Sequence, residues 1–486
     1  VDGDASNAAK STVYNHTITY KGWHYIRFNI TPDGATSNGR LKINFKNSGT
    51  YLLDNIILSQ DAWDTWIVAP SGGDYTTIQD ALENSNYGNG DIILVKDKSG
   101  GYYLNNYDGL YNSTNDHNGK YVDLTKSSIL DNHNGTINRP IVIRNYIEGN
   151  GTHHTPKIKT DGSDAIAAGK SDTAINHLEI AGFEIEGPNQ NITYTQANTY
   201  RQLIVDAVYT DPSNPDKEQA AWDGGNRKNI FHGNGISIKR GTYINVHGNK
   251  VHNTTGSGIR VDNGDYLRLH DNEVYNTTWW TWNAPSAIVI AQSRNIFNDN
   301  TRKMRIERNL VYNNINKIPY FNPGYTEIAG KCNGADDTHK TADDKNSTGY
   351  GCGGQNKIID GSGVYITRNN SDGAPFASDE NPNDQYIGQF YFANNVAYGN
   401  GMNGLVVHKT NNTVATNNTI YGNGEVPTRG NSEVGYSAYG VDWKDALALG
   451  RQNASGLVVH TSSDVKIYNN ISWARETTDN AYSLFL

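Results

Sequence analysis

Lysine, arginine and aspartate side chains occur in two short stretches of this chain and could together act on an acidic sugar. Lys239 ends the stretch Gly235–Lys239, and Arg260 and Asp262 lie in the stretch Gly258–Asp262, about one repeat later. An arginine can neutralise a sugar carboxylate and so acidify the proton on the adjacent carbon. A lysine whose pKa is lowered by neighbouring positive charge can remove that proton. We therefore predict that Lys239, Arg260 and Asp262 form a candidate catalytic cluster; the alternative interpretation is a solvated strand face with a surface ion pair.

Aromatic and basic residues elsewhere in the chain supply the other groups that such a centre needs. Tyr365 and His408 are further candidate catalytic residues, because each lies at an outward position of an expected strand. The turn at 279–282 reads Trp-Trp-Thr-Trp and would give the cationic cluster an aromatic wall suited to sugar rings. The predicted substrate-binding residues are Arg240, Trp279, Trp280, Trp282 and Arg368.

A phrase of Asn, a variable residue, a small or β-branched residue and an aromatic residue returns through the second half of the chain. Two of its intervals, Asn249 to Asn272 and Asn395 to Asn418, are 23 residues each. A fixed period of about 20–25 residues without helix-forming stretches is typical of a β-solenoid. The Asn is expected in a turn, with its amide paired to the Asn of the next coil. The phrase begins at Asn249, Asn272, Asn309, Asn395, Asn418 and Asn470.

A second phrase, a small residue followed by two apolar residues separated by one position, predicts one strand per coil with its apolar side chains inward. Such strands stack into a parallel sheet, so the fold class is predicted to be all-β, a right-handed parallel β-helix. The outward residues then form two columns, Ser237, Arg260, Val289, Tyr365, Val406 and Val458 beside Lys239, Asp262, Ala291, Thr367, His408 and His460. Large inserts at 186–233, 313–360 and 423–453 are expected to build the binding surface.

Residues 1–62 have a different pattern from the rest of the chain. Apolar and polar residues alternate between turn signals there, which predicts a small N-terminal β-sandwich-like segment similar to the closing strands of a carbohydrate-binding module. The parallel β-helix is predicted to span 63–486. At its entry we expect a strand near Trp66, a capped helix at 76–82 covering the open end of the first coil, and a buried strand at 91–95.

Composition argues against several kinds of partner. The chain has 486 residues and a net charge of −9, which disfavours general affinity for nucleic acid or for an acidic membrane. No apolar run approaches the roughly 20 residues of a membrane span. Only 19% of residues are charged, whereas Gly and Tyr are abundant, as in a turn-rich all-β protein. We expect a monomer.

The two cysteines, Cys332 and Cys352, lie in one polar insert. A disulfide closing that insert is favoured over two free thiols and would suit an oxidising compartment. We therefore expect a secreted, extracellular or periplasmic protein. The insert also carries Asp336-Asp337 and Asp343-Asp344, which make calcium the one candidate cofactor, although a solvated charged loop is the favoured interpretation. No other metal or cofactor is predicted.

The coil phrases and the Lys239–Arg260 spacing resemble those of β-helix polysaccharide lyases of the chondroitinase B and alginate lyase kind. That family uses a strand lysine as base and an arginine about one coil later, and Lys239 and Arg260 are 21 residues apart. The family's arginine precedes His-Gly, whereas Arg260 here precedes Val261-Asp262, and His232-Gly233-Asn234-Gly235 replaces the family's acidic calcium ligands. The resemblance implies a secreted enzyme that cleaves a uronic-acid polysaccharide by β-elimination. It also implies that Lys239 is the base, that Arg260 neutralises the carboxylate, and that Tyr365 or His408 returns a proton to the leaving oxygen.

Two other functions fit the same scaffold. A glycoside hydrolase would need two carboxyl groups flanking the bond, with Asp262 as one and Asp265, Asp360 or Asp223 as its partner. A non-catalytic carbohydrate-binding or adhesive solenoid would keep the aromatic residues but need no cluster of Lys239, Arg260 and Asp262. Elimination creates a product that absorbs ultraviolet light, hydrolysis creates reducing ends without that absorbance, and a binding protein gives neither signal.

Overall fold

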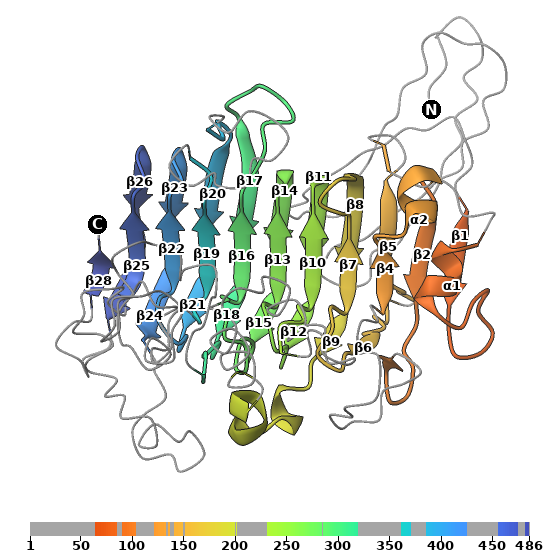
Figure 1. The fold of residues 1–486 in the computed structure, drawn as a ribbon. Helices are drawn as coiled ribbons and strands as arrows, with labels where there is room; N and C mark the ends of the chain where they lie inside the picture. The colour runs from red at the N-terminus through yellow and green to blue at the C-terminus, as the bar shows by residue number, and fades with distance from the viewer. Residues whose placement is uncertain are drawn as a thin grey trace, which may run out of the picture.

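The structure, a computed structural model, confirms the predicted right-handed parallel β-helix (Figure 1). It describes residues 64–84, 90–103, 121–132, 135–136, 140–148, 151–199, 201, 231–283, 285–318, 361–370, 385–424, 455–474 and 482–485. Figure 1 shows the coils stacked in one direction, from β1 at the red end of the colour range to β28 at the blue end. Strands contributed by successive coils pair in parallel and form three sheets, which we call sheets A, B and C.

Each sheet takes one strand from each coil. Sheet A consists of β1 (Thr65–Val68), β2 (Ile92–Val95), β5 (Ile141–Asn145), β8 (Ile175–Ala181), β11 (Gly241–His247), β14 (Asp265–His270), β17 (Arg302–Glu307), β20 (Gln389–Ala393), β23 (Thr413–Thr416) and β26 (Val465–Tyr468). Sheet B consists of β4 (Val122–Leu124), β7 (Ile166–Ala168), β10 (Ile236–Lys239), β13 (Ile259–Asp262), β16 (Ile288–Ala291), β19 (Val364–Thr367), β22 (Leu405–His408), β25 (Ser455–His460) and β28 (Tyr482–Phe485). Sheet C consists of β3 (Tyr102–Tyr103), β6 (Lys157–Lys159), β9 (Glu184–Glu186), β12 (Lys250–His252), β15 (Glu273–Tyr275), β18 (Leu310–Tyr312), β21 (Val396–Tyr398), β24 (Thr419–Asn423) and β27 (Ile471–Ala474).

The entry to the solenoid follows the predicted order of strand, helix and buried strand. Helix α1 (Ile78–Leu82) lies between β1 and β2, and its N-cap Thr77 accepts a hydrogen bond from the backbone N–H of Asp80. The helix buries Ile78, Ala81 and Leu82 at the first coils. The other helices with defined bounds are α2 (Ser127–Asn132) and the short 3₁₀ helix η1 (Asn189–Asn191).

The two recurring phrases correspond to two different sheets. The phrase that begins with a small residue forms the strands of sheet B from β10 to β25, and the Asn phrase forms the strands of sheet C from β12 to β27. The small residue is needed because the start of a sheet B strand lies close to a sheet C strand, as β13 does to β15. A Cβ atom at Gly258 would lie 2.3 Å from Cγ1 of Val274. A larger side chain there would push the sheets apart.

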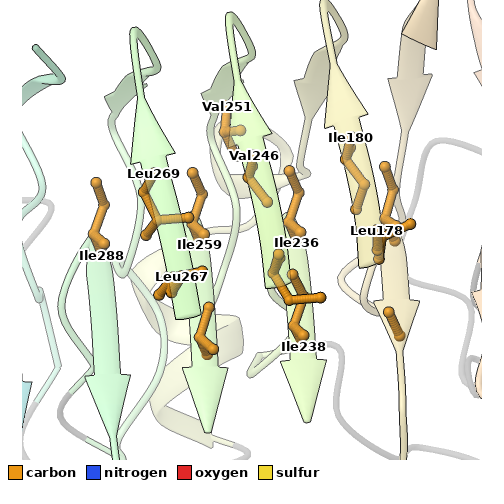
Figure 2. Close-up of a cluster of buried hydrophobic side chains, with 14 of the residues drawn as sticks. Leu178, Ile180, Ile236, Ile238, Val246, Val251, Ile259, Leu267, Leu269 and Ile288 are labelled. Carbon is orange, nitrogen blue, oxygen red and sulfur yellow. The ribbon is translucent and has the colours of Figure 1, made fainter. Parts of the chain in front are cut away.

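The core is a continuous column of inward aliphatic side chains. Figure 2 shows Ile236 and Ile259 of sheet B aligned coil by coil, together with Val246 and Leu269 of sheet A. All four are at most 2% exposed. The outward residues alternate with them, so the pleat decides which side chains are available for function.

The corner between sheets B and A begins with a residue of positive φ directly after the sheet B strand. Its φ lies between 47° and 58° in six coils, at Arg240, Asn263, Gln292, Arg368, Lys409 and Thr461. Such a corner holds the last outward residues of each sheet B strand at the same place in each coil. Register is therefore kept from β10 to β25 without a bulge.

The corner between sheets A and C carries the predicted asparagine ladder. In each step the side-chain amide of one Asn donates to the side-chain oxygen of the next, over distances of 2.8–3.1 Å. The ladder runs through Asn249, Asn272, Asn309, Asn395, Asn418 and Asn470. The aromatic residues that end the same phrases also stack, and the ring centroids of Tyr275 and Tyr312 are 4.9 Å apart.

Replacing Asn309 with Ala is expected to lower the free energy of unfolding by at least about 2 kcal/mol, because buried donors and acceptors would lose their partners. The side chain of Asn309 bonds Asn272, Asn395 and the carbonyl of Leu269, all within 3.1 Å. Denaturant unfolding followed by circular dichroism measures the change. Asn300→Ala, at an exposed position, is the matched control. Equal stability of the two variants would contradict a stabilising role for the ladder.

Several predictions lie outside the described residues. These are the β-sandwich-like segment at 1–62, the pairing of Cys332 with Cys352, and the acidic insert with Asp336 and Asp343. Among the helices that the structure describes, none is long and apolar enough to cross a membrane.

Candidate functional site

The register of sheet B brings the predicted catalytic residues onto one outward face. Lys239 on β10 pairs with Asp262 on β13, and Ser237 pairs with Arg260. The same two columns continue through β16, β19, β22 and β25, as the phrases predicted. The pairing in register therefore places Asp262, rather than Arg260, level with Lys239.

Arg260 is fixed by an ion pair along its own strand. Its Nε lies 2.7 Å from Oδ2 of Asp262, and its Nη2 lies 2.9 Å from Oδ1. Burial disfavours the charge of Arg260, but the carboxylates of Asp262 and Asp164 outweigh burial and raise the pKa of the guanidinium. Bidentate contact sets the plane of the guanidinium and leaves other N–H groups to meet a substrate carboxylate. Asp262 is thus a positioning residue for Arg260.

Lys239 is exposed, and the residue level with it is a carboxylate. Its neighbour Arg240 is the corner residue, and Nη1 of Arg240 donates to the carbonyl of Ser171 at 2.8 Å. The charge of Arg260 is balanced by Asp262. The surplus of positive charge that the sequence hypothesis placed around Lys239 is therefore reduced by Asp262.

A second cluster of polar groups lies farther along the same face. The hydroxyls of Tyr365 and Thr367 are each 2.9 Å from Nδ1 of His408. Burial, together with the positive charges of His460, Lys409 and Arg368, lowers the pKa of His408 to about 4. Above that pH the ring is neutral, and Nδ1 can accept a hydrogen bond from the hydroxyl of Tyr365.

The two clusters are separated by two buried apolar residues. Val289 lies between Arg260 and Tyr365 in one column, and Ala291 lies between Asp262 and Thr367 in the other. Arg260 and Tyr365 are thus two strands apart, about 9–10 Å between backbones. Lys239 and His408 are four strands apart, so these two residues do not belong to one local cluster.

The tryptophan turn differs from the prediction. Trp280 is 6% and Trp282 is 2% exposed, so neither ring is available to stack on a sugar. The indole N–H of Trp280 donates to the carbonyl of Asn189 at 2.8 Å, and the ring of Trp282 packs on His232. Trp279 is half-buried, with Nζ of Lys317 over its ring. These rings pack a connection between sheets C and B instead of lining a wall.

The proposed hydrolase partner Asp265 is also a structural residue. It is 0% exposed on β14 of sheet A, where it accepts a hydrogen bond of 2.7 Å from the hydroxyl of Tyr386 and pairs with the buried Lys303 at 3.4 Å. It therefore cannot flank a sugar bond with Asp262. The other candidate partners, Asp360 and Asp223, lie outside the described residues.

Asp164 is a residue near the site that the sequence predictions missed. It lies two residues before β7, the position that Asn234 occupies before β10, and its Oδ1 accepts two hydrogen bonds from Asn234 at 2.7 and 2.9 Å. Aligning the coils one step further back would have found it. No group of three or more His, Cys, Asp or Glu side chains placed to hold a metal ion occurs in the described part of the chain.

No family model and no curated protein sequence matches this chain. Among solved structures, the chain is similar to a mannuronan C-5 epimerase A-module of Azotobacter vinelandii, with 12% identity, a TM-score of 0.35, and coverage of 81% of this chain and 69% of that one. It is similar to an alginate lyase of a Paenibacillus species, with 14% identity, a TM-score of 0.35, and coverage of 87% and 99%. A pectate lyase gives 13% identity, a TM-score of 0.26, and coverage of 86% and 79%.

Proposed function

We propose that this protein is a polysaccharide lyase that cleaves a uronic-acid polymer by β-elimination on the outward face of sheet B. The observation that carries the proposal is the placement of Arg260 and of the Tyr365–His408 pair in line on the same face, two strands apart. Arg260 is suited to bind a carboxylate, and the Tyr365–His408 pair is suited to proton transfer. Small apolar residues lie between them. Because such a polymer is found outside cells, we also propose an extracellular or periplasmic location.

Arg260 is the proposed carboxylate site. Charge-assisted hydrogen bonds of about 2.8 Å would hold the uronate group and withdraw electrons from it. Withdrawal acidifies the proton on the adjacent carbon C5, and the guanidinium then stabilises the negative charge that develops on the carboxylate as that proton leaves. Asp262 keeps the guanidinium in place, so no reorganisation is needed during the reaction.

Tyr365 is the proposed proton-transfer residue, assisted by His408. The C5 proton moves to the oxygen of Tyr365 as the hydroxyl proton of Tyr365 moves to the neutral Nδ1 of His408, so no free phenolate forms. The electron pair of the C5–H bond forms the C4–C5 double bond as the bond from C4 to the bridging oxygen breaks. Tyr365 then gives the proton it took to that oxygen, and His408 returns the phenol proton. The products are an unsaturated uronate and a free hydroxyl end.

Lys239 has a different role in this arrangement from the one its sequence suggested. It lies on the far side of Arg260 from Tyr365, level with Asp262. We propose that it binds the carboxylate of the neighbouring sugar unit and so contributes to affinity. Lys239→Ala should therefore raise KM with little loss of kcat.

Incubation with a panel of polyuronates, followed by ultraviolet absorbance, tests the proposed reaction. Absorbance should rise with at least one polymer and be absent with neutral polysaccharides. Reducing ends without absorbance would instead indicate hydrolysis. Binding without either signal would favour a non-catalytic solenoid.

The pH dependence of the reaction is expected to have its acidic limb near pH 4, because His408 must be neutral and its pKa is about 4. Activity is present above this pH and is lost as pH falls through it. Lys409→Gln removes a positive charge that opposes protonation of His408, so the limb should move to higher pH by up to about one unit. Profiles of kcat/KM for this variant and for the control Lys466→Gln measure the shift. An unchanged limb in Lys409→Gln would remove His408 from the proton-transfer step.

A further inference from the structure

A second charged surface lies on the outward face of sheet A. Its centre is a column in register on three successive coils, where Arg268 of β14 pairs with Arg305 of β17, and Arg305 pairs with Tyr391 of β20. Their strand neighbours are core residues, so the three side chains point away from the core. Arg302 and Arg308 flank the column, and both are exposed. We call these five residues the arginine strip.

The strip concentrates positive charge on a protein whose net charge is −9. Arg305 pairs with Glu307 at 2.8 Å, and Arg308 pairs with Asp271 through two contacts of 2.8 Å. Glu307 and Asp271 thus offset part of the positive charge of the four arginines. Burial lowers the pKa of Arg268, and the adjacent charge of Arg305 lowers it further. Like charges in cross-strand register destabilise a sheet, and departures from local rules of this kind occur at functional sites.

Tyr391 adds an aromatic surface to the strip. The guanidinium carbon of Arg302 lies 3.6 Å from the centroid of its ring, and Nε of Arg302 donates to Oε1 of Gln389 at 3.3 Å. The stacked pair is held in a fixed orientation next to Arg305. An aromatic ring, a side-chain amide and guanidinium groups in one line can contact the apolar face, the hydroxyls and the carboxylates of a sugar chain.

We propose that the arginine strip is a second binding site for an acidic polysaccharide, separate from the site on sheet B. Coils are about 4.8 Å apart, similar to the length of one sugar unit, so successive guanidiniums can meet carboxylates on successive units. A carboxylate between Arg268 and Arg305 relieves their repulsion. A polyphosphate chain fits less well, because Glu307 and Asp271 border the strip and the protein is acidic. The identity of the ligand as the polymer cleaved on sheet B rests on the proposed function.

The test is the affinity of the full chain for a long polyuronate, measured by calorimetry in a Tyr365→Phe background so that the polymer stays intact. Arg268→Gln/Arg305→Gln keeps the apolar stems and removes both charges, and it should weaken binding about tenfold. Lys126→Gln, at an exposed position just before α2, is the matched control and should leave affinity unchanged. In the otherwise unchanged enzyme, the double variant should keep its kcat on short oligosaccharides that reach only the site on sheet B.

Two outcomes would overturn the inference. One is undiminished affinity of the correctly folded double variant for the long polymer. The other is binding of double-stranded DNA at the same ionic strength that is as tight as polymer binding and equally sensitive to the double substitution. These results are independent of the proposed reaction, because binding is measured without turnover. A protein that cleaves no polyuronate but binds one through the strip would refute the proposed function alone.

Discussion

Tyr365→Phe is expected to lower kcat by about 10²–10⁴-fold on the polyuronate that the protein cleaves, the usual contribution of a positioned proton-transfer group. The substitution removes only the hydroxyl, which lies 2.9 Å from Nδ1 of His408. The stacked arrangement of the two rings, with centroids 5.9 Å apart, stays available to Phe. KM should change little, because Arg260 still binds the carboxylate. Initial rates of ultraviolet absorbance measure both parameters.

Two further variants separate this role from a structural one. His408→Gln should also lower kcat, and combining it with Tyr365→Phe should cause little additional loss, because the two residues act as one unit. Lys239→Ala should differ from both by raising KM. If Tyr365→Phe retains full kcat while Lys239→Ala abolishes it, the base is Lys239, as the sequence had suggested, and the role given to Tyr365 is wrong.

The outward face of sheet B could be derived from the sequence because a coil repeats both its strand and its corner. The small residue that opens each phrase fixes the start of the strand, and the pleat then fixes which residues point outward. Arg260 and Tyr365 are 105 residues apart in the chain, yet their phrases place them in one column. The column is insensitive to the length of the insert between two coils. This is why the register was predictable although the intervals were irregular.

Burial of individual side chains outside the strands could not be derived in the same way. The phrases give no position for Trp280 or Trp282, because both lie in a connection whose partners, Asn189 and His232, come from earlier coils. The ion pair of Arg260 could not be predicted either, because its carboxylate partner lies two residues along the same strand and not in the neighbouring coil. A count of charges per face does not show which of them are already paired.

Asp265 is another residue whose burial and pairing could not be derived from the sequence. Its substitution has the largest expected effect on stability. The carboxylate lies under the connection between β16 and β17. Its Oδ2 accepts the backbone N–H groups of Ile296 and Phe297 at 3.1 and 3.2 Å. Lys303, whose side chain is 0% exposed, lies 3.4 Å from the same oxygen, and the hydroxyl of Tyr386 donates to Oδ1. Burial raises the pKa of Tyr386, and the charge of Asp265 raises it further. The tyrosine therefore stays protonated and remains a donor.

Asp265→Ala is expected to lower the free energy of unfolding by about 3–5 kcal/mol, because it leaves the ammonium group of Lys303 buried without this counter-charge. Denaturant unfolding followed by circular dichroism measures the loss. Asp299→Ala is the matched control, since Asp299 also contacts Lys303, at 3.6 Å, but is much more exposed and should matter less. Asp265→Leu combined with Lys303→Met removes both buried charges and should recover only part of the stability, because the N–H groups of Ile296 and Phe297 still lose their acceptor. If Asp265→Ala is as stable as Asp299→Ala, the buried pair does not hold this connection to the coil.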